Sequence, residues 1–399
     1  MNKLFQQSSK LLPVALAIAL LAAGCNSGPI EPPISLVPTV LDASYFSSNT
    51  DIHLTDNTDL TVDYIVEGVG DVSGKLTIDP GVVIEFAEDA GLDILDNGSI
   101  SAVGTEALPI ILTAESKVPG FWRGVQVQSN SVLNQIEYVT ISYGGGEAFN
   151  SNDMRGNLIL WPESRLSADN CALINSGSYG VNIGHDVEVP SFTDNVLTDN
   201  QTAGYLHATT MNVMDESNQM TGNDNDYVEV LVGDLNPGTV TIENIGIPYR
   251  VVPCCSGIFR DLGIVNGVNM IIAPGVEMEF DEDCGLYIQE GSSFRAVGNT
   301  TEPIIFTGVS KIAGAWRGLY FSFTNSPNNL VENARIEYAG SGDADAAIYM
   351  WADPNLAVNN VEIYDIDGCA FTSGSGAANP NFNSSNVDAQ RVTGGVECF

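Results

Sequence analysis

Short alternating segments fill the chain from about residue 41 onward. In residues 82–86 (VVIEF) the apolar side chains at 82, 84 and 86 share one face of an extended strand, and Glu85 lies on the other. Residues 110–113 (IILT) form a continuous apolar run instead, which is typical of a parallel strand covered by its neighbours. Gly, Asn and Asp separate such segments throughout. The pattern therefore predicts many short β-strands.

The same pattern recurs 194 positions later. Residues 80–124 and 274–318 align without a gap and are identical at 24 of 45 positions. Residues 276–280 (VEMEF) repeat the alternating strand, and residues 304–307 (IIFT) repeat the apolar run. A fixed repeat of short strands is typical of a solenoid, in which each coil buries its inner face by stacking on the next.

The repeat and the absence of long helical patterns define the predicted fold class. No amphipathic segment of helical period and ten or more residues follows the N-terminal leader, which excludes doubly wound folds, because their crossovers are helices. We predict an all-β, right-handed parallel β-helix solenoid built from two duplicated halves, residues 41–245 and 246–399.

The N-terminal region has the features of an export signal followed by a tether. Residues 1–24 combine two lysines with an apolar run too short to span a membrane, and they end in small residues. Residues 21–25 (LAAGC) resemble a bacterial lipobox, which implies cleavage before Cys25 and lipidation of that residue. In lipoproteins an Asp after this Cys retains the protein at the inner membrane, so Asn26 favours the outer membrane. Residues 25–40 are rich in proline and are predicted to form an extended tether.

Charge narrows the range of partners. The chain has 14 Lys and Arg against 50 Asp and Glu, a net charge of −36, while 44% of its residues are hydrophobic. Such a polyanion repels nucleic acid and anionic lipid surfaces, so no nucleic-acid partner is expected. Adaptation to a salty exterior and an acidic binding surface both explain the charge. The expected partners are the membrane, through the lipid anchor, and a polysaccharide or surface protein.

Several strings carry a resemblance to a known family. They are LTIDPGVVIEF at residues 76–86, AVG at 102–104, PIILT at 109–113, the WRG motif at 122–124 and IEYVTISYGG at 136–145. Together they resemble bacterial lipoproteins with right-handed parallel β-helix, pectate-lyase-like repeats, over about residues 60–399. The resemblance implies the fold; for function it leaves lyases, hydrolases, adhesins and passive stalks open, because all of them use this architecture.

Cysteines downstream of the lipobox give disulfide candidates, since an exported protein can form disulfides. The pairs that lie one or two coils apart are Cys254 or Cys255 with Cys284, and Cys369 with Cys398. The sequence contains no C-x-x-C motif and no Cys/His cluster, so zinc, iron–sulfur and haem sites lack support.

The basic residues of the twin blocks are the main enzymatic candidates. The resemblance implies that a β-helix lyase would use carboxylate-bound Ca²⁺ with an Arg or Lys as base. Arg123 and Arg317 in the two WRG motifs, and Lys117 and Lys311 before them, are such residues. Because an active site is needed once, whereas a structural contact recurs in every repeat, we interpret them as structural and expect each Arg to pair with an outer carboxylate. No catalytic residue is predicted.

Histidines and tryptophans give weaker signals. His53, His185 and His207 have no nucleophile-elbow context, which disfavours a catalytic triad. The tryptophans are expected to pack in the core or in ladders rather than to form a sugar-stacking platform; they are Trp122, Trp161, Trp316 and Trp351.

Acidic turns are the remaining metal candidates, because Ca²⁺ prefers carboxylate oxygens. The candidates are Glu88, Asp89, Asp224, Asp226, Glu282 and Asp283. None belongs to an EF-hand loop, and solvated turn acids are the alternative interpretation. No other cofactor is predicted.

The leading functional hypothesis is a non-catalytic cell-envelope lipoprotein, a binding or scaffold module that presents a β-helix surface to glycan or protein partners. The alternative is a polysaccharide lyase, Ca²⁺-dependent, or a glycoside hydrolase of β-helix type. Since the duplicated residues are interpreted as structural, a functional site is expected where the halves differ, at residues 146–156, 184–190 and 224–260.

Overall fold

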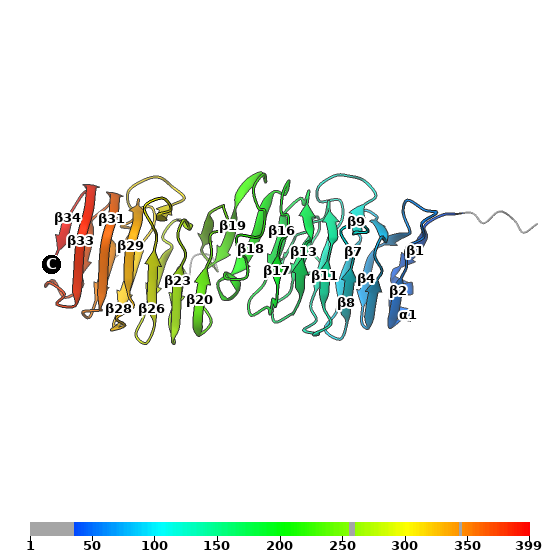
Figure 1. The fold of residues 1–399 in the computed structure, drawn as a ribbon, viewed down its shortest axis with the longest axis horizontal. Coiled ribbons are helices and arrows are strands. Elements are labelled where there is room, and N and C mark those ends of the chain that lie inside the picture. Colours follow the sequence, from blue (N-terminus) through cyan, green and yellow to red (C-terminus); the bar gives the residue numbers. More distant parts are fainter. Residues whose placement is uncertain (1–35, 255–259, 343–344) are drawn as a thin grey trace, which may run out of the picture. The chain divides into compact units, whose positions relative to one another are not determined.

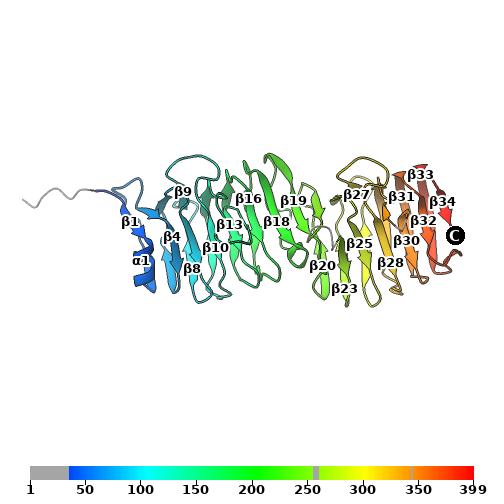
Figure 2. The ribbon, with the colours of Figure 1, turned by 180° about the vertical axis from the view of Figure 1, so that it is seen from behind.

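The computed structural model describes residues 36–254, 260–342 and 345–399. Residues 37–399 form one compact unit, an all-β parallel solenoid of about 14 turns with almost no helix. Its strands follow one another in chain order from β1 to β34 (Figures 1 and 2). The predicted all-β parallel solenoid is confirmed, and its construction from two duplicated halves stays a prediction.

Four parallel sheets form the faces of the solenoid. Sheet 1 contains β1 (Thr39–Asp42), β3 (Tyr64–Glu67), β6 (Val83–Phe86), β9 (Ile110–Ala114), β12 (Val139–Ser142) and β15 (Ala172–Ile174). Sheet 2 contains β2 (Asp51–Leu54), β5 (Lys75–Ile78), β8 (Ser99–Val103), β11 (Gln135–Glu137), β14 (Ser167–Asp169) and β17 (Phe192–Thr193). Sheet 4 contains β22 (Asp261–Ile264), β25 (Gly285–Ile288), β28 (Gly318–Ser322), β30 (Ala346–Trp351), β32 (Cys369–Ser373) and β34 (Gly395–Cys398).

Sheet 3 is the longest. Its first strands are β4 (Val69–Val72), β7 (Gly91–Ile94), β10 (Val125–Val127), β13 (Leu158–Leu160), β16 (Tyr179–Ile183), β18 (Thr202–His207) and β19 (Asn225–Leu231). It continues through β21 (Tyr249–Val252), β24 (Glu277–Phe280), β27 (Ile304–Gly308), β29 (Leu330–Glu337), β31 (Leu356–Ile366) and β33 (Phe382–Val392). Through β29 it also includes β26 (Ser293–Val297), β23 (Val268–Ile272) and β20 (Gly238–Ile242).

The alternation in the sequence sets the inside and outside of each coil. In β6, Ile84 and Phe86 are 2% and 0% exposed, and in its twin β24, Met278 and Phe280 are both fully buried. The residues between them point outward, as the period of a strand requires. The apolar side chains of successive coils thereby form one continuous core.

Two stacked tryptophans tie neighbouring coils together within this core. Trp122 stacks on Phe86 at 3.9 Å between ring centroids, and Trp316 stacks on Phe280 at 4.2 Å. Both indoles are fully buried, and their N–H groups donate to backbone carbonyls at 2.8 and 2.7 Å. Core packing, as expected from the sequence, holds for these two residues.

Trp351 departs from core packing, which was one of the two arrangements expected for the tryptophans. It ends β30 and is 41% exposed, whereas its neighbour Met350 is fully buried. The alternation at the strand end places Trp351 on the outer face, where it lies over Gly374. A Cβ at Gly374 would sit 2.2 Å from the indole, so only glycine leaves room for the ring. Trp161 is intermediate in exposure.

Asparagine side chains form two stacks at the corners of successive coils, five residues apart along the chain. Asn195 donates to the side-chain oxygen of Asn218, and Asn200 donates to that of Asn223, both at 3.1 Å and across 23 residues. The oxygen of Asn195 in turn accepts from the backbone N–H of Cys171 at 2.9 Å. These bonds satisfy corner amides that the β-ladders do not reach.

A short helix, α1 (Ala43–Ser48), packs against β1 and β4 near the start of the unit. Asp42 caps it by accepting from the N–H of Tyr45 at 2.8 Å, and Phe46 is 1% exposed. Gly70 makes room for this ring, because a Cβ there would lie 2.7 Å from it. Among the described residues, no helix has the length and apolar character needed to cross a bilayer.

Parallel pairing crosses the region between the twin blocks. The strand β19 pairs with β18 on one side and with β21 on the other, and Asp234 bridges to Gly263. Twin strands nevertheless occupy different sheets: β6 lies in sheet 1 and β24 in sheet 3, while β7 lies in sheet 3 and β25 in sheet 4. The second block is therefore shifted by one face, and this shift leaves openings on the surface around residues 212–263.

Candidate functional site

The twin lysines make the same contacts in both blocks. Lys117 lies 3.1 Å from a carboxylate oxygen of Glu85, and Lys311 lies 3.5 Å from one of Glu279. Each lysine also donates to a threonine hydroxyl at 3.2 Å. Since Glu85 and Glu279 are twin positions, these contacts are part of how the coil is built.

The twin arginines differ in their partners. Arg317 forms an ion pair with Asp261, as expected. Arg123 instead donates to the backbone carbonyl of Asp89 at 2.9 Å and to that of Ala148. The expectation of an outer carboxylate is therefore wrong for Arg123, because the turn around Ala148 supplies a carbonyl at that position.

The acidic calcium candidates lie in separate turns. Asp226 accepts from the backbone N–H of Asn223 at 2.8 Å, and Asp283 pairs with Arg260 at 2.7 Å. Asp89 and Asp283 both have positive φ, 56° and 60°, as turn residues do. Glu88, Asp224 and Glu282 are exposed. In the part of the chain that the structure describes, no three His, Cys, Asp or Glu residues gather closely enough to hold a metal ion.

Of the two predicted cysteine pairings, the structure forms one. Cys369 and Cys398 make a disulfide that joins β32 to β34. The pairing of Cys284 is wrong: its thiol is free and fully buried, and Cys254 is disulfide-bonded. The side chain of Cys284 points into the core between coils, which separates it from the surface, and burial raises its pKa to about 12. Cys255 lies outside the described residues.

A cleft of about 320 Å³ opens on sheet 3, and we call it the tyrosine–histidine cleft. Its principal lining residues are Met154, Tyr179, Asn182, His185, Tyr205 and His207. The three segments in which the twin blocks differ all contribute to it, through Met154, His185 and Leu231. The structure thus brings together the three segments that differ between the twin blocks, which are the segments where a functional site was expected.

Two tyrosines form one wall of the cleft. The rings of Tyr179 and Tyr205, on the adjacent strands β16 and β18, lie 5.5 Å apart. The hydroxyl of Tyr179 donates to Glu229 at 2.6 Å. Burial, and then Glu229, raise the pKa of Tyr179, and the same causes raise the pKa of Tyr205 to about 12. Both phenols therefore remain protonated hydrogen-bond donors at neutral pH and are unsuited to act as bases.

Two histidines stand at the far end. The rings of His185 and His207 meet edge to face at 5.7 Å. The Nδ1 of His207 accepts from the backbone N–H of Thr209 at 3.2 Å. Burial and the neighbouring His185 lower the pKa of His207, so its imidazole is neutral at pH 7 and leaves the other nitrogen as a donor.

Asn182 is the polar group that distinguishes the cleft floor. It is 3% exposed, and its Nδ2 donates to the backbone carbonyl of Arg155 at 3.2 Å. Its Oδ1 is buried and has no hydrogen-bond partner among the described residues. An unpaired buried acceptor costs about 1–3 kcal/mol. Because Asn182 lines the cleft, a donor that enters can pair with this oxygen once the amide turns toward it.

A second cavity, of about 550 Å³, adjoins the first, because His207 lines both. Asp234, Asp261, Tyr287 and Arg317 line it as well. Burial raises the pKa of Asp261, against the opposing effect of Arg317. The two cavities together extend the polar and aromatic surface across the offset between the twin blocks.

An outward tyrosine ladder leads away from this second cavity. Tyr287, Tyr320 and Tyr349 occupy the same register position of β25, β28 and β30. Their ring centroids lie 5.3 and 4.6 Å apart. Tyr320 stacks on Tyr349, whereas the ring of Tyr287 is tilted against it at 52°.

Sequence reasoning did not single out Tyr179, Asn182 or Tyr205. The register aligns Asn182 with Tyr205 on the next coil, and Tyr179 with Thr202. An available signal was the change in residue type along one register row. That row runs from Asp71 and Asp93 through Gln126 and Ile159 to Asn182 and Tyr205.

The arrangement is suited to binding. The nearest arginines are engaged, Arg155 with Asp153 and Arg317 with Asp261. The phenols stay protonated, and Glu229 is held by Tyr179. Stacking surfaces, neutral donors and one free acceptor are the groups of a recognition site for a ligand that is partly apolar and rich in hydroxyls.

Comparison with known proteins yields one similarity. Residues 47–159 match the model of a family described as a pectate-lyase like beta helix domain. No curated protein and no solved structure matches the chain. The match agrees with the parallel β-helix observed here and supports a carbohydrate-related role in general. It ends before Tyr179, so the family model does not cover most of the tyrosine–histidine cleft.

Proposed function

We propose that this protein is a non-catalytic binding module of the cell envelope that binds a glycan in the tyrosine–histidine cleft. The observation that carries the proposal is the buried Oδ1 of Asn182, unpaired within the described chain, in a cleft walled by two tyrosine rings. A sugar has an apolar face that packs against an aromatic ring and hydroxyl groups that donate hydrogen bonds. The apolar face of the sugar would pack against the tyrosine rings, and a sugar hydroxyl would donate to the unpaired oxygen of Asn182.

The cellular location is part of the proposal and is supported by the sequence alone. The signal at residues 1–24 and the lipobox-like ending at Cys25 favour a lipid anchor, and Asn26 favours the outer membrane. These residues lie outside the described part of the chain. The proline-rich residues after Cys25 would hold the solenoid away from the lipid surface.

Polysaccharide lyase or glycoside hydrolase activity is the second candidate function. One observation favours it: Asp261 has a raised pKa and lines the second cavity together with Asp234. A carboxyl group with a raised pKa is what a general acid requires. The ion pair with Arg317 opposes this role, because it stabilises the carboxylate.

A glycan array probed with the full chain, with and without Ca²⁺, identifies the ligand, and calorimetry with the best ligand measures affinity. Asn182→Leu should weaken binding about tenfold, since it removes one hydrogen bond worth about 1.4 kcal/mol. Tyr205→Ala should weaken it at least as much. Tyr320→Ala is the matched control, because this outward tyrosine lines neither cavity, and it should bind as the wild type does.

Two results would refute the proposal. One is equal affinity of the Asn182→Leu and wild-type proteins, which would place the ligand elsewhere. The other is release of unsaturated uronate, followed by ultraviolet absorbance, or of reducing ends from a polysaccharide, which would establish an enzyme. If the Asp261→Asn variant lost such polysaccharide-cleaving activity, the active site would lie in the second cavity.

A further inference from the structure

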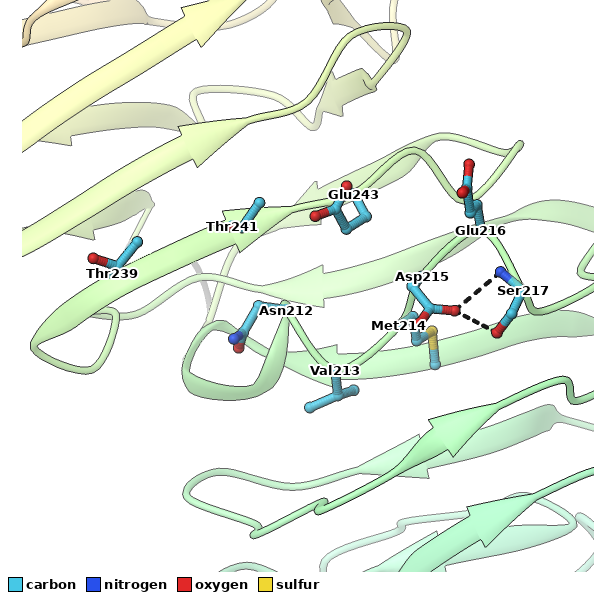
Figure 3. Close-up of a pocket in the computed structure, with 9 residues that line it drawn as sticks. All are labelled: Asn212, Val213, Met214, Asp215, Glu216, Ser217, Thr239, Thr241 and Glu243. Carbon is cyan, nitrogen blue, oxygen red and sulfur yellow. Dashed lines mark hydrogen bonds between the residues drawn. The ribbon is translucent and has the colours of Figure 1, made fainter.

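The strand β20 has a free edge at the offset between the twin blocks. Its hydrogen-bonded neighbour is β23, and it pairs with no other strand within the described residues. Residues 212–217 run past it on the other side without forming a ladder (Figure 3). The sheet is therefore interrupted at this point.

The direction of the backbone groups follows from the pairing with β23. The N–H of Gly238 donates to Gly267, and the carbonyl of Ile242 accepts from Ala273. Because backbone groups alternate between the two sides of a strand, those of Thr239 and Thr241 point away from β23. The free edge thus presents two N–H groups and two carbonyls to a possible additional strand.

A cavity of about 590 Å³ lies along this edge. Thr239 and Thr241 of β20, and Glu243 directly after it, line one side of the cavity, and residues 212–217 line the other. Figure 3 shows Thr239, Thr241 and Glu243 in a row beside residues 212–217, with the side chains of Val213 and Met214 turned away from that row. The opening therefore combines a hydrogen-bonding edge with a mainly polar lining.

The charge of this cavity is negative. Asp215, Glu216 and Glu243 line it, and it contains no Lys or Arg among its described lining residues. A second copy of the chain is a poor occupant, because each copy carries a net charge of −36 and the copies repel each other. Charge complementarity favours a basic segment instead.

We propose that β20 is a docking edge for an extended basic peptide, which adds as a strand between β20 and residues 212–217. Its backbone pairs with Thr239 and Thr241, and its alternate Lys or Arg side chains approach Glu216 and Glu243. This is strand addition, in which the main chain supplies the affinity and the alternating side chains supply the specificity. It is independent of glycan binding.

The test uses fluorescence anisotropy of the full chain with a labelled, blocked peptide of alternating lysine and valine. Two further peptides carry N-methyl groups on either all the lysines or all the valines. In an extended peptide the N–H groups of the lysines point to one side and those of the valines point to the other, so only one of these two sets can face β20. Methylation of the set that faces β20 removes its hydrogen bonds and should weaken binding at least tenfold, whereas methylation of the other set should leave binding unchanged. Both methylated peptides keep the same charge.

Thr241→Pro tests the protein side, since it removes an N–H that the pairing with β23 does not use and edge strands tolerate proline. It should weaken binding at least tenfold. His53→Pro is the matched control, on the edge strand β2. His53 pairs with Thr77, and Thr241 pairs with Ile271. Because Thr77 and Ile271 are twin positions, His53 and Thr241 occupy equivalent places on their edge strands. His53→Pro should leave binding unchanged. Glu216→Gln with Glu243→Gln should weaken binding severalfold.

The proposal fails if the peptide does not bind, or if both methylated peptides bind like the parent. In the latter case the attraction is general to the acidic surface. It also fails if Thr241→Pro, with a melting temperature near that of the wild type, binds normally. Should Thr241→Pro not fold, the methylated peptides decide the question with the wild-type protein alone.

Discussion

Replacement of Trp122 by alanine tests whether the stacked indoles tie the coils together. The side chain is fully buried, stacks on Phe86 at 3.9 Å, and donates to the carbonyl of Ser142 at 2.8 Å. Burial of a tryptophan removes about 150–250 Å² from water, which at about 25 cal/mol per Å² is about 4–6 kcal/mol. The orphaned Ser142 carbonyl adds about 1 kcal/mol unless water enters the space. Together we expect Trp122→Ala to lower the free energy of unfolding by about 5–7 kcal/mol.

The same substitution at two other positions provides the comparison. Trp316→Ala should cost about as much, because Trp316 is equally buried, stacks on Phe280 and donates to the carbonyl of Glu337. Trp351→Ala should cost about 1–2 kcal/mol, since the indole is 41% exposed and its removal leaves no closed cavity.

Urea unfolding followed by circular dichroism measures all three variants without relying on tryptophan fluorescence. Hydrogen exchange adds a local measurement: Trp122→Ala should raise exchange in β6, β9 and β10 more than in β24 and β27, because coils contact mainly their neighbours. If Trp122→Ala and Trp351→Ala lower stability equally, the stack does not hold the coils and the reasoning is wrong.

Two further predictions concern titratable groups. Burial raises the pKa of the Cys171 and Cys284 thiols to about 12. Neither thiol should therefore react with iodoacetamide at pH 8 in the folded protein, whereas both should react in urea. Peptide mapping that finds either cysteine labelled in the folded protein would contradict this prediction. The pKa of His207 is lower in the folded protein than in the unfolded chain, so the unfolded chain binds a proton at this residue first as the pH falls below about 6.5. The stability of the fold should therefore decrease below that pH. The variant His207→Gln should lose less stability than the wild type between pH 7 and pH 5. Equal losses for wild type and variant in calorimetric melts would exclude this role of His207.

The fold was predictable because its signals are local. Alternation in residues 82–86 defines which side chains point inward, and its recurrence in residues 276–280 indicates a repeat. The exposure of Trp351 was not predictable in the same way, since the duplicated context near Leu356 resembles that of Trp161. The difference arises at the end of β30, where Gly374 of the next coil leaves space for an outward ring.

The candidate site was predictable as a region but not as a set of residues. Differences between the twin blocks pointed to residues 146–156 and 184–190, and both contribute to the tyrosine–histidine cleft. The position of Tyr205 beside Tyr179 depends on the register between coils, which varies with the length of each turn. The incorrect prediction of a disulfide for Cys284 has a similar cause. The number of coils between two cysteines does not say whether their side chains point into the core or toward the surface.

The corner asparagines divide each coil into a part of fixed length and a part that is free to change. Asn195 and Asn200 bond to Asn218 and Asn223, so the five-residue step from one stack to the other is the same on both coils. One residue inserted within that step would break a bond in one of the stacks. A residue inserted in the remaining turns of the coil, including those that line the cleft, would leave both stacks in place. The solenoid can therefore accept a longer or shorter turn at the cleft without losing these bonds.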